Sequence, residues 1–288
     1  MSACGEVKDN LNLDASVTSR ARCNPAASFG VPTPLSSLNT PSDDERADLS
    51  SDELAIYFSS TRPGGVGGFD IYKATRASST EPFGTATLVT GMNTTADERG
   101  PRMTADGLSL FAYSRPTSTS PQHITLATRT GNTLPFGGLQ VIAQVDGTTD
   151  DVDPYILQNG NVLYFTSNRA GNYGLYRSSK IAGAFSTPTQ VSGVNLDLPG
   201  IENSPVVTPD ELTLYWSSDR PGGSGGLDIY VATRPTTADG FGAPVALTNL
   251  NTASLDTPTW ISPDGCVLYF SRAEANVGFQ LYFAMRGP

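Results

Sequence analysis

The sequence predicts an all-β fold, a five-bladed β-propeller of four-stranded antiparallel blades, on three observations. A block at residues 59–72 returns almost unchanged at residues 217–230. A hairpin turn signal occurs five times along the chain, and no segment has the apolar 3.6-residue period of a long helix. Self-similarity at a fixed period marks a repeat fold, in which each unit buries its apolar faces only against its neighbours.

Each unit opens with an inner strand and a tight turn. The inner strands are marked by residues roughly 50 positions apart, at Ala47, Pro101, Pro154, Pro205 and Pro258. A turn pair follows each of them, namely Asp52-Glu53, Asp106-Gly107, Asn159-Gly160, Asp210-Glu211 and Asp264-Gly265. Asp-Gly and Asn-Gly between apolar runs are strong hairpin signals because the turn needs positive φ angles. We therefore expect a hairpin at the start of every unit.

Three further strands follow in each of the first four units, and two follow in the fifth. Aromatic, β-prone runs predict second strands at 54–58, 108–113, 162–165, 212–216 and 267–270. Third strands are expected at 70–72, 124–126, 175–176, 228–230 and 280–282. Fourth strands are expected after Phe83, Phe136, Phe185 and Phe241, where Val or Leu occupies alternate positions. Four short antiparallel strands in a unit of about 50 residues form a propeller blade.

The two ends of the chain predict how the ring closes. The last unit ends after its third strand, and residues 29–35 parallel residues 241–247, which open a fourth strand. We therefore expect residues 29–38 to supply the outer strand of the fifth blade, which would remove an open sheet edge. Residues 29–288 then form a single propeller domain, and residues 1–28, which are polar, form a flexible tether.

Composition excludes some classes of partner. The formal net charge is −10, and 18 dispersed Lys and Arg residues do not make the basic footprint that nucleic acid requires. No stretch approaches the roughly 20 apolar residues of a membrane span. We expect a soluble, monomeric domain that meets a membrane only through a possible lipid anchor.

The cysteines predict an exported protein. Ser2, Ala3 and Cys4 match the end of a bacterial lipoprotein signal, so Cys4 is a lipidation candidate; an ordinary N-terminus is the alternative. If Cys4 carries lipid, Cys23 and Cys266 remain as a pair. A disulfide between them would hold the closing strand to the fifth blade and would fit an oxidising compartment; the alternative is two unpaired thiols.

The repeat resembles a known family. The residues are Ser-Pro-Asp-Gly-Cys-Val-Leu-Tyr-Phe-Ser at 262–271, with Ser-Ser-Asp-Arg-Pro-Gly-Gly at 217–223 and Leu-Asp-Ile-Tyr at 227–230. They resemble the WD40-like repeat of the Tol-system propeller over roughly residues 29–288. The Tol-system protein resembles a six-bladed propeller with a separate N-terminal domain, whereas this chain has five units and only a tail. The resemblance therefore does not imply that this chain binds the Tol partner. The five-unit chain also resembles exported propellers of this repeat class from myxobacteria, most of which have no assigned activity.

Acidic residues recur before the inner strands. They lie three residues before the strand marker in four units, at Asp44, Glu98, Asp151 and Glu202; the fifth unit has Leu255 there and Asp256 one place later. We expect them to surround one mouth of the central channel, where they could hold a cation such as Ca²⁺ or ligand groups. The structural alternative is that they cap turn amides or pair with the arginines Arg62, Arg115, Arg169, Arg220 and Arg272.

Other candidate residues are few. Trp260 on an inner strand is either core packing or a platform on which a sugar could stack, and His123, the only histidine, argues against a Ser-His-Asp triad or a multi-histidine zinc site. No catalytic residue and no cofactor other than possible Ca²⁺ is predicted.

Two functions follow from this sequence. The first is a non-enzymatic binding or scaffolding propeller of the bacterial cell envelope that recognises a protein, a glycan or peptidoglycan. It would be located in the periplasm, on the outer membrane as a lipoprotein, or at the cell surface. The alternative is a five-bladed, glycan-active hydrolase that uses the carboxylates at the channel mouth.

Overall fold

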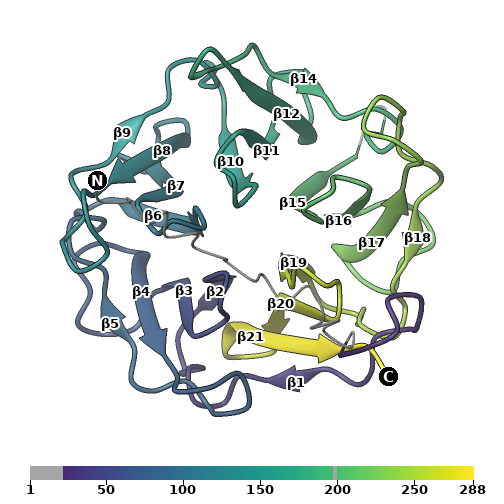
Figure 1. Ribbon diagram of the computed structural model, residues 1–288, viewed down its shortest axis with the longest axis horizontal. Helices are drawn as coiled ribbons and strands as arrows, with labels where there is room; N and C mark the ends of the chain where they lie inside the picture. Colours follow the sequence, from purple (N-terminus) through teal and green to yellow (C-terminus); the bar gives the residue numbers. More distant parts are fainter. Residues whose placement is uncertain (1–21, 197–199) are drawn as a thin grey trace, which may run out of the picture.

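The computed structural model describes residues 22–196 and 200–288. They form five antiparallel sheets arranged as blades around a central axis, and they contain no helix (Figure 1). The predicted five-bladed propeller is confirmed. None of these residues belongs to a helix long and apolar enough to cross a membrane.

Each blade runs from an inner to an outer strand, and blades 1 to 5 are numbered in chain order. Blade 1 holds β2 (Asp44–Leu49), β3 (Ala55–Ser60), β4 (Asp70–Thr75) and β5 (Thr87–Leu88). Blade 2 holds β6 (Asp97–Met103), β7 (Ser109–Arg115), β8 (His123–Thr128) and β9 (Gln140–Val141). Blade 3 holds β10 (Asp151–Ile156), β11 (Val162–Ser167) and β12 (Gly174–Ile181), with both β13 (Ala184–Phe185) and β14 (Thr189–Gln190) paired to β12. Blade 4 holds β15 (Glu202–Val207), β16 (Thr213–Ser218), β17 (Asp228–Thr233) and β18 (Val245–Ala246).

The N-terminal part of the domain completes the fifth blade. Blade 5 holds β19 (Asp256–Ile261), β20 (Val267–Glu274), β21 (Gly278–Met285) and then β1 (Thr33–Pro34). Strand β1 lies along β21, so the two ends of the colour range meet in Figure 1, and Thr33 faces Phe283 in the register. The predicted closure by residues 29–38 is confirmed, with the regular strand confined to two residues.

A disulfide lies beside this closure. Cys23 and Cys266 are bonded, with an S–S distance of 2.07 Å and 243 positions between them in the sequence. Cys266 directly precedes β20, and the Asn24 N–H donates to the Gly287 carbonyl. Both chain ends of the described domain are thus tied to blade 5. The other cysteine, Cys4, lies outside the described residues, as does most of the predicted tether.

Apolar side chains from neighbouring blades pack between the sheets. The largest fully buried side chains come mostly from the second strands, and they include Trp216, Tyr164, Tyr215, Phe58, Phe111, Phe165 and Phe270. This matches the aromatic runs that predicted those strands.

The glycine-rich loops join the second and third strands of blades 1 and 4. The Asp70 carboxylate accepts from the N–H groups of Val66 (2.9 Å) and Gly67 (3.2 Å) and so fixes the loop before β4. A Cβ added to Gly67 would collide with the Ala96 carbonyl oxygen, which lies just before blade 2. The loop is therefore a spacer packed against the next blade, and glycine is required for that close approach.

Candidate functional site

The five acidic residues occupy equivalent positions at or next to the start of the inner strands. Asp44 faces Ser60 across its hairpin, and Asp256 faces Arg272 in the same register. Asp256 is thus the structural equivalent of the other four, and the fifth unit is offset by one residue from the alignment that placed Leu255 there. All five side chains are buried, with 0 to 1% exposure.

Four of these carboxylates cap the turn that precedes their own strand. Each accepts the N–H of the residue four positions earlier, at 2.6 to 2.8 Å: Thr40 for Asp44, Thr94 for Glu98, Gly147 for Asp151 and Thr252 for Asp256. A charged acceptor satisfies a buried backbone donor especially well. The capping of turn amides, which was one of the two structural roles considered from the sequence, is therefore present in four blades.

Four of the five also pair with an arginine of their own blade. The pairs are Asp44 with Arg62 at 2.5 Å, Asp151 with Arg169 at 2.6 Å, Glu202 with Arg220 at 2.9 Å and Asp256 with Arg272 at 2.7 Å. Each guanidinium also lies 4.8 to 5.3 Å from the centroids of two aromatic rings, one on the second and one on the third strand. In these blades the carboxylate is one part of a repeated packing unit.

Blade 2 lacks this unit. Ser114 faces Glu98, and Arg115 faces Asp97, so Pro116 takes the place that Arg62 has in blade 1. Glu98 therefore has hydrogen bonds to Thr94 but no arginine partner among the ion pairs of the described residues. Burial raises the pKa of Glu98, and the nearby Asp70 and Asp97 raise it further. Arg115 was predicted as a pairing partner and does not pair with Glu98.

Charged side chains from different blades cross the centre of the ring. Arg46 of blade 1 donates its Nε–H to Asp153 of blade 3 at 2.5 Å, and Asp153 also accepts from the Ser204 hydroxyl of blade 4 at 2.7 Å. Burial alone would raise the pKa of Asp153, but the charge of Arg46 and these hydrogen bonds hold it below its usual value. Arg46, Asp153 and Ser204 all have positive φ at a bulge of the inner strand.

A second arginine closes the channel alongside the first. Arg102 of blade 2 pairs with Asp48 of blade 1 at 2.9 Å and donates to the Thr259 carbonyl of blade 5. Its guanidinium also lies 4.6 Å from the centroid of Tyr155 in blade 3. The space left among Arg46, Arg102 and Asp153 has a volume of about 10 Å³, room for one water at most.

The expectation of an acidic channel mouth is not matched by this geometry. Each carboxylate makes its contacts inside its own blade, and ion pairs fill the centre. The described residues contain no group of three or more His, Cys, Asp or Glu side chains placed to hold a metal ion. Trp260 is 3% exposed and packs edge to face on Tyr269 at 5.6 Å, so it is core and offers no open face for stacking.

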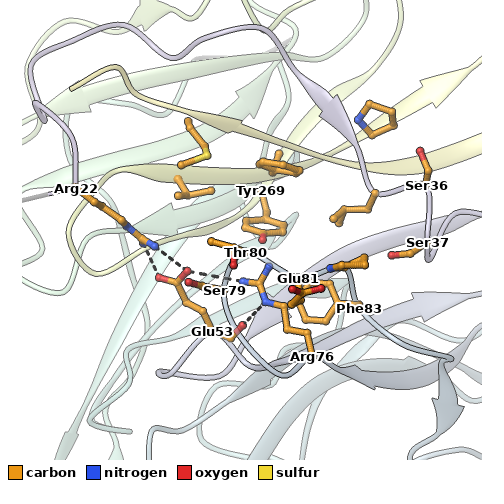
Figure 2. A pocket seen from close by; sticks show the side chains of 16 residues that line it. Arg22, Ser36, Ser37, Glu53, Arg76, Ser79, Thr80, Glu81, Phe83 and Tyr269 are labelled. Atoms are coloured by element: carbon orange, nitrogen blue, oxygen red, sulfur yellow. Dashed lines mark hydrogen bonds and ion pairs between the residues drawn. The ribbon is translucent and has the colours of Figure 1, made fainter.

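A lateral pocket of about 640 Å³ lies between blades 5 and 1. Phe83 and Tyr269 line it (Figure 2), with Phe283 and Met285, and polar or charged side chains make up the other half of its lining. Sequence reasoning missed it because it considered only the inner strands. The sequence did contain a signal. One position of the third strand is Lys73, Leu126, Arg177 and Val231 in blades 1 to 4, and only in blade 5 is it an aromatic residue, Phe283.

Comparison with known proteins supports the fold and goes no further. No family model matches the sequence, and no curated protein matches it. Among solved structures, TolB from Acinetobacter baumannii is 16% identical with a TM-score of 0.53, covering 87% of this chain and 56% of that one. This chain therefore spans little more than half of that TolB.

Two sugar-cleaving enzymes have similar structures. A thermostable family-43 glycoside hydrolase is 13% identical with a TM-score of 0.56, covering 87% of this chain and 95% of that chain. The catalytic domain of the GH62 α-L-arabinofuranosidase from Coprinopsis cinerea is 11% identical with a TM-score of 0.53, covering 91% of this chain and 98% of that chain. At such identities these likenesses show the propeller fold alone.

Proposed function

We propose that this protein is a non-enzymatic binding or scaffolding propeller of the bacterial cell envelope. The observation that carries the proposal is the closed centre of the ring. Arg46 pairs with Asp153 and Arg102 pairs with Asp48, each between two blades. The space left among Arg46, Arg102 and Asp153 is about 10 Å³. A rigid ring of this kind presents its loops and rims to a partner, and it needs no reaction chamber.

The alternative, a glycan hydrolase, requires features that the inner carboxylates lack. Glycosidases use two accessible carboxyl groups on either side of the bond, one with a raised pKa and one ionised. Here the five carboxylates have 0 to 1% exposure, and four are held by arginines. Only Glu98, with a raised pKa and no arginine, resembles a general acid, and at 1% exposure it is not accessible to a sugar.

The recognition surface that we favour is the rim formed by blades 2 and 3. Arg115 has a buried Nε without a hydrogen-bond partner among the described residues. Arg99 of β6 faces blade 1, where it lies 3.4 Å from the ring centroid of Phe69 and 3.5 Å from the Glu45 carboxylate, and its side chain is 26% exposed. The loops at 116–122 and 170–174 depart from the glycine-rich pattern of blades 1 and 4. Departures from a repeat are where binding groups are commonly added, and arginines suit a protein or glycan with acidic groups.

Export and anchoring belong to the same proposal. A lipid on Cys4 would hold the propeller at the envelope through the residues before the disulfide. Intact-mass analysis of the native chain and of a Cys4→Ser variant tests it. A diacylglyceryl mass on the native chain alone is expected, and a native chain without added mass would refute it.

A thermal-shift screen of the full chain tests the function. The panel contains Ca²⁺, neutral oligosaccharides, peptidoglycan fragments and acidic glycans. A ligand at about 100 times its Kd stabilises the fold by roughly 2.7 kcal/mol, a shift of about 5 °C or more for a domain of this size. We expect a hit that is lost in an Arg99→Ala, Arg115→Ala variant.

A parallel assay with chromogenic glycosides addresses the alternative. Glu98→Gln and Glu202→Gln are matched variants, because both remove a buried inner-strand charge and only Glu98 lacks an arginine. No turnover is expected from any form. Turnover that Glu98→Gln abolishes and Glu202→Gln preserves would replace the binding proposal by the hydrolase.

A further inference from the structure

The lateral pocket between blades 5 and 1 has the size and lining of a small-molecule site. Its 640 Å³ falls within the roughly 300 to 1,000 Å³ of ligand pockets. The wall from blade 5 carries Tyr269 stacked on Phe283 at 5.6 Å, with Met285 beside them at 48% exposure. The opposite wall carries Phe83 from blade 1 (Figure 2).

The clefts between blades 1 and 2 and between blades 4 and 5 hold smaller pockets, of about 350 and 480 Å³, whereas the cleft between blades 3 and 4 is bridged by polar side chains. There, Arg177 of blade 3 donates to Glu211 of blade 4 at 2.8 Å, and the Tyr164 hydroxyl donates to the same carboxylate at 2.6 Å. Arg177 faces Tyr164 in the register as Phe283 faces Tyr269. The polar side chain that reaches across the blade 3–4 cleft is therefore replaced by a ring that cannot hydrogen-bond across it.

Glu53 of blade 1, which is equivalent to Glu211 of blade 4, pairs with Arg22. Glu53 and Glu211 occupy the same turn position, each with a φ of 60°. The carbonyl of each accepts from the Nε–H of an arginine directly after the third strand, Arg76 and Arg234, at 2.8 Å. Glu53 pairs with Arg22 at 2.5 Å, whereas Glu211 accepts from the Tyr164 hydroxyl across its cleft.

The charges at this end of the pocket are mutually satisfied. Arg22 bonds both Glu53 and Asp264, at 2.5 and 2.7 Å. Arg76 lies 4.4 Å from the ring centroid of Phe83. None of the pocket's lining residues has a buried polar side-chain atom without a partner. Glu81 also lines the pocket, and no ion pair of the described residues includes it, so the lining disfavours an anion. A ligand that bound Arg22 or Glu53 through a charge would have to break their pairs, whereas a neutral apolar ligand would only displace water from Phe283 and Met285.

We propose that the lateral pocket is a binding site for a neutral, largely apolar small molecule that carries an aromatic ring, stacked against Phe283. The site shares no residue with the closed centre of the ring or with the rim of blades 2 and 3. It is thus a second function of the propeller, independent of the envelope partner proposed above.

Titration with N-phenyl-1-naphthylamine, a neutral aromatic probe that fluoresces in apolar sites, tests the proposal on the full chain. Saturable binding of one probe per chain is expected. Phe283→Arg copies the native arginine of the blade 3–4 cleft and should close the pocket, weakening binding at least about tenfold, which corresponds to about 1.4 kcal/mol. Val245→Ser removes an apolar side chain of 61% exposure on β18 and should change nothing.

A second variant keeps the test decisive if Phe283→Arg does not fold. Met285→Glu changes a half-exposed side chain at the pocket edge and should also weaken binding about tenfold. Non-saturable fluorescence, or equal affinity in wild type and Met285→Glu, would overturn the proposal. So would binding that appears only after residues 1–21 are removed, because the chain's own N-terminal segment would then be the occupant.

Discussion

Removing the disulfide between Cys23 and Cys266 should destabilise the propeller strongly, because the bond closes a very long loop. The unfolded chain loses conformational entropy when two residues 243 positions apart are joined. The chain-entropy relation for a loop of this length gives about 5 kcal/mol at 25 °C. Strand β1 also pairs with β21 through the backbone, so we expect the folded ring to persist when the bond is broken.

Equilibrium unfolding in guanidinium chloride measures this quantity. The proteins are the oxidised wild type, the reduced wild type and a Cys23→Ser variant. Cys23 is 5% exposed and packs in the core cluster of the closing blade, so the serine adds a packing loss that reduction does not. We expect a loss of about 3 to 5 kcal/mol on reduction, with Cys23→Ser slightly below the reduced wild type.

The comparison also separates the entropic account from a local one. If the bond acts by constraining the unfolded chain, the denaturant midpoint falls while the folded-state far-UV spectrum stays unchanged. Equal midpoints for the oxidised and reduced proteins would refute the reasoning. A reduced protein that loses its β1 pairing without a change in global stability would show that the bond only pins a local strand.

Two further predictions use matched pairs of variants. Glu211→Gln should cost about 1 kcal/mol at pH 7, because its contacts with Arg177 and Tyr164 outweigh burial and lower the pKa of Glu211; the cost should shrink as the pH falls below about 4. Glu98→Gln should be neutral or stabilising at pH 7, because burial raises the pKa of Glu98, and its difference from wild type should vanish in acid; a large cost at neutral pH would contradict this. Gly67→Ala should lower the melting temperature by several degrees, on the order of 1 to 3 kcal/mol, whereas Gly138→Ala, where a Cβ meets nothing, should not; equal melts would show that the loop can relax.

The sequence predicted the ring because the residues that define a blade recur at a fixed spacing. The hairpin turns, the aromatic second strands and the displaced fourth strand of blade 5 each follow from backbone chemistry that repeats in every unit. The channel was not predictable in the same way. Arg46, Gly100, Asp153 and Ser204 share one bulge position but no chemistry, so their pairing depends on which blades face each other across the axis.

The carboxylates show how the same repeat logic can mislead. An acid in every unit looks like a ring of ligands when the inner strands alone are considered. With its arginine and two aromatic rings included, it becomes the centre of a packing unit, since burying an unpaired charge would be costly. The repeated Asp and Glu residues were therefore correctly located and carry the structural role in four blades.

Function in this propeller is better sought where the packing unit is broken. Blade 2 loses the arginine and both aromatic rings of the unit together, with Pro116, Ala112 and Thr125 in their places, and a carboxylate is left behind. The seam of blades 5 and 1 has Phe283 where blade 3 has its cross-blade arginine, and its pocket is larger than the pockets of about 350 and 480 Å³ at the seams of blades 1 and 2 and of blades 4 and 5. A site of 640 Å³ at the one seam that the chain's two ends create can change its lining without disturbing the remaining repeats. The pH profile of Glu98→Gln and the probe affinity of Phe283→Arg test these two breaks separately.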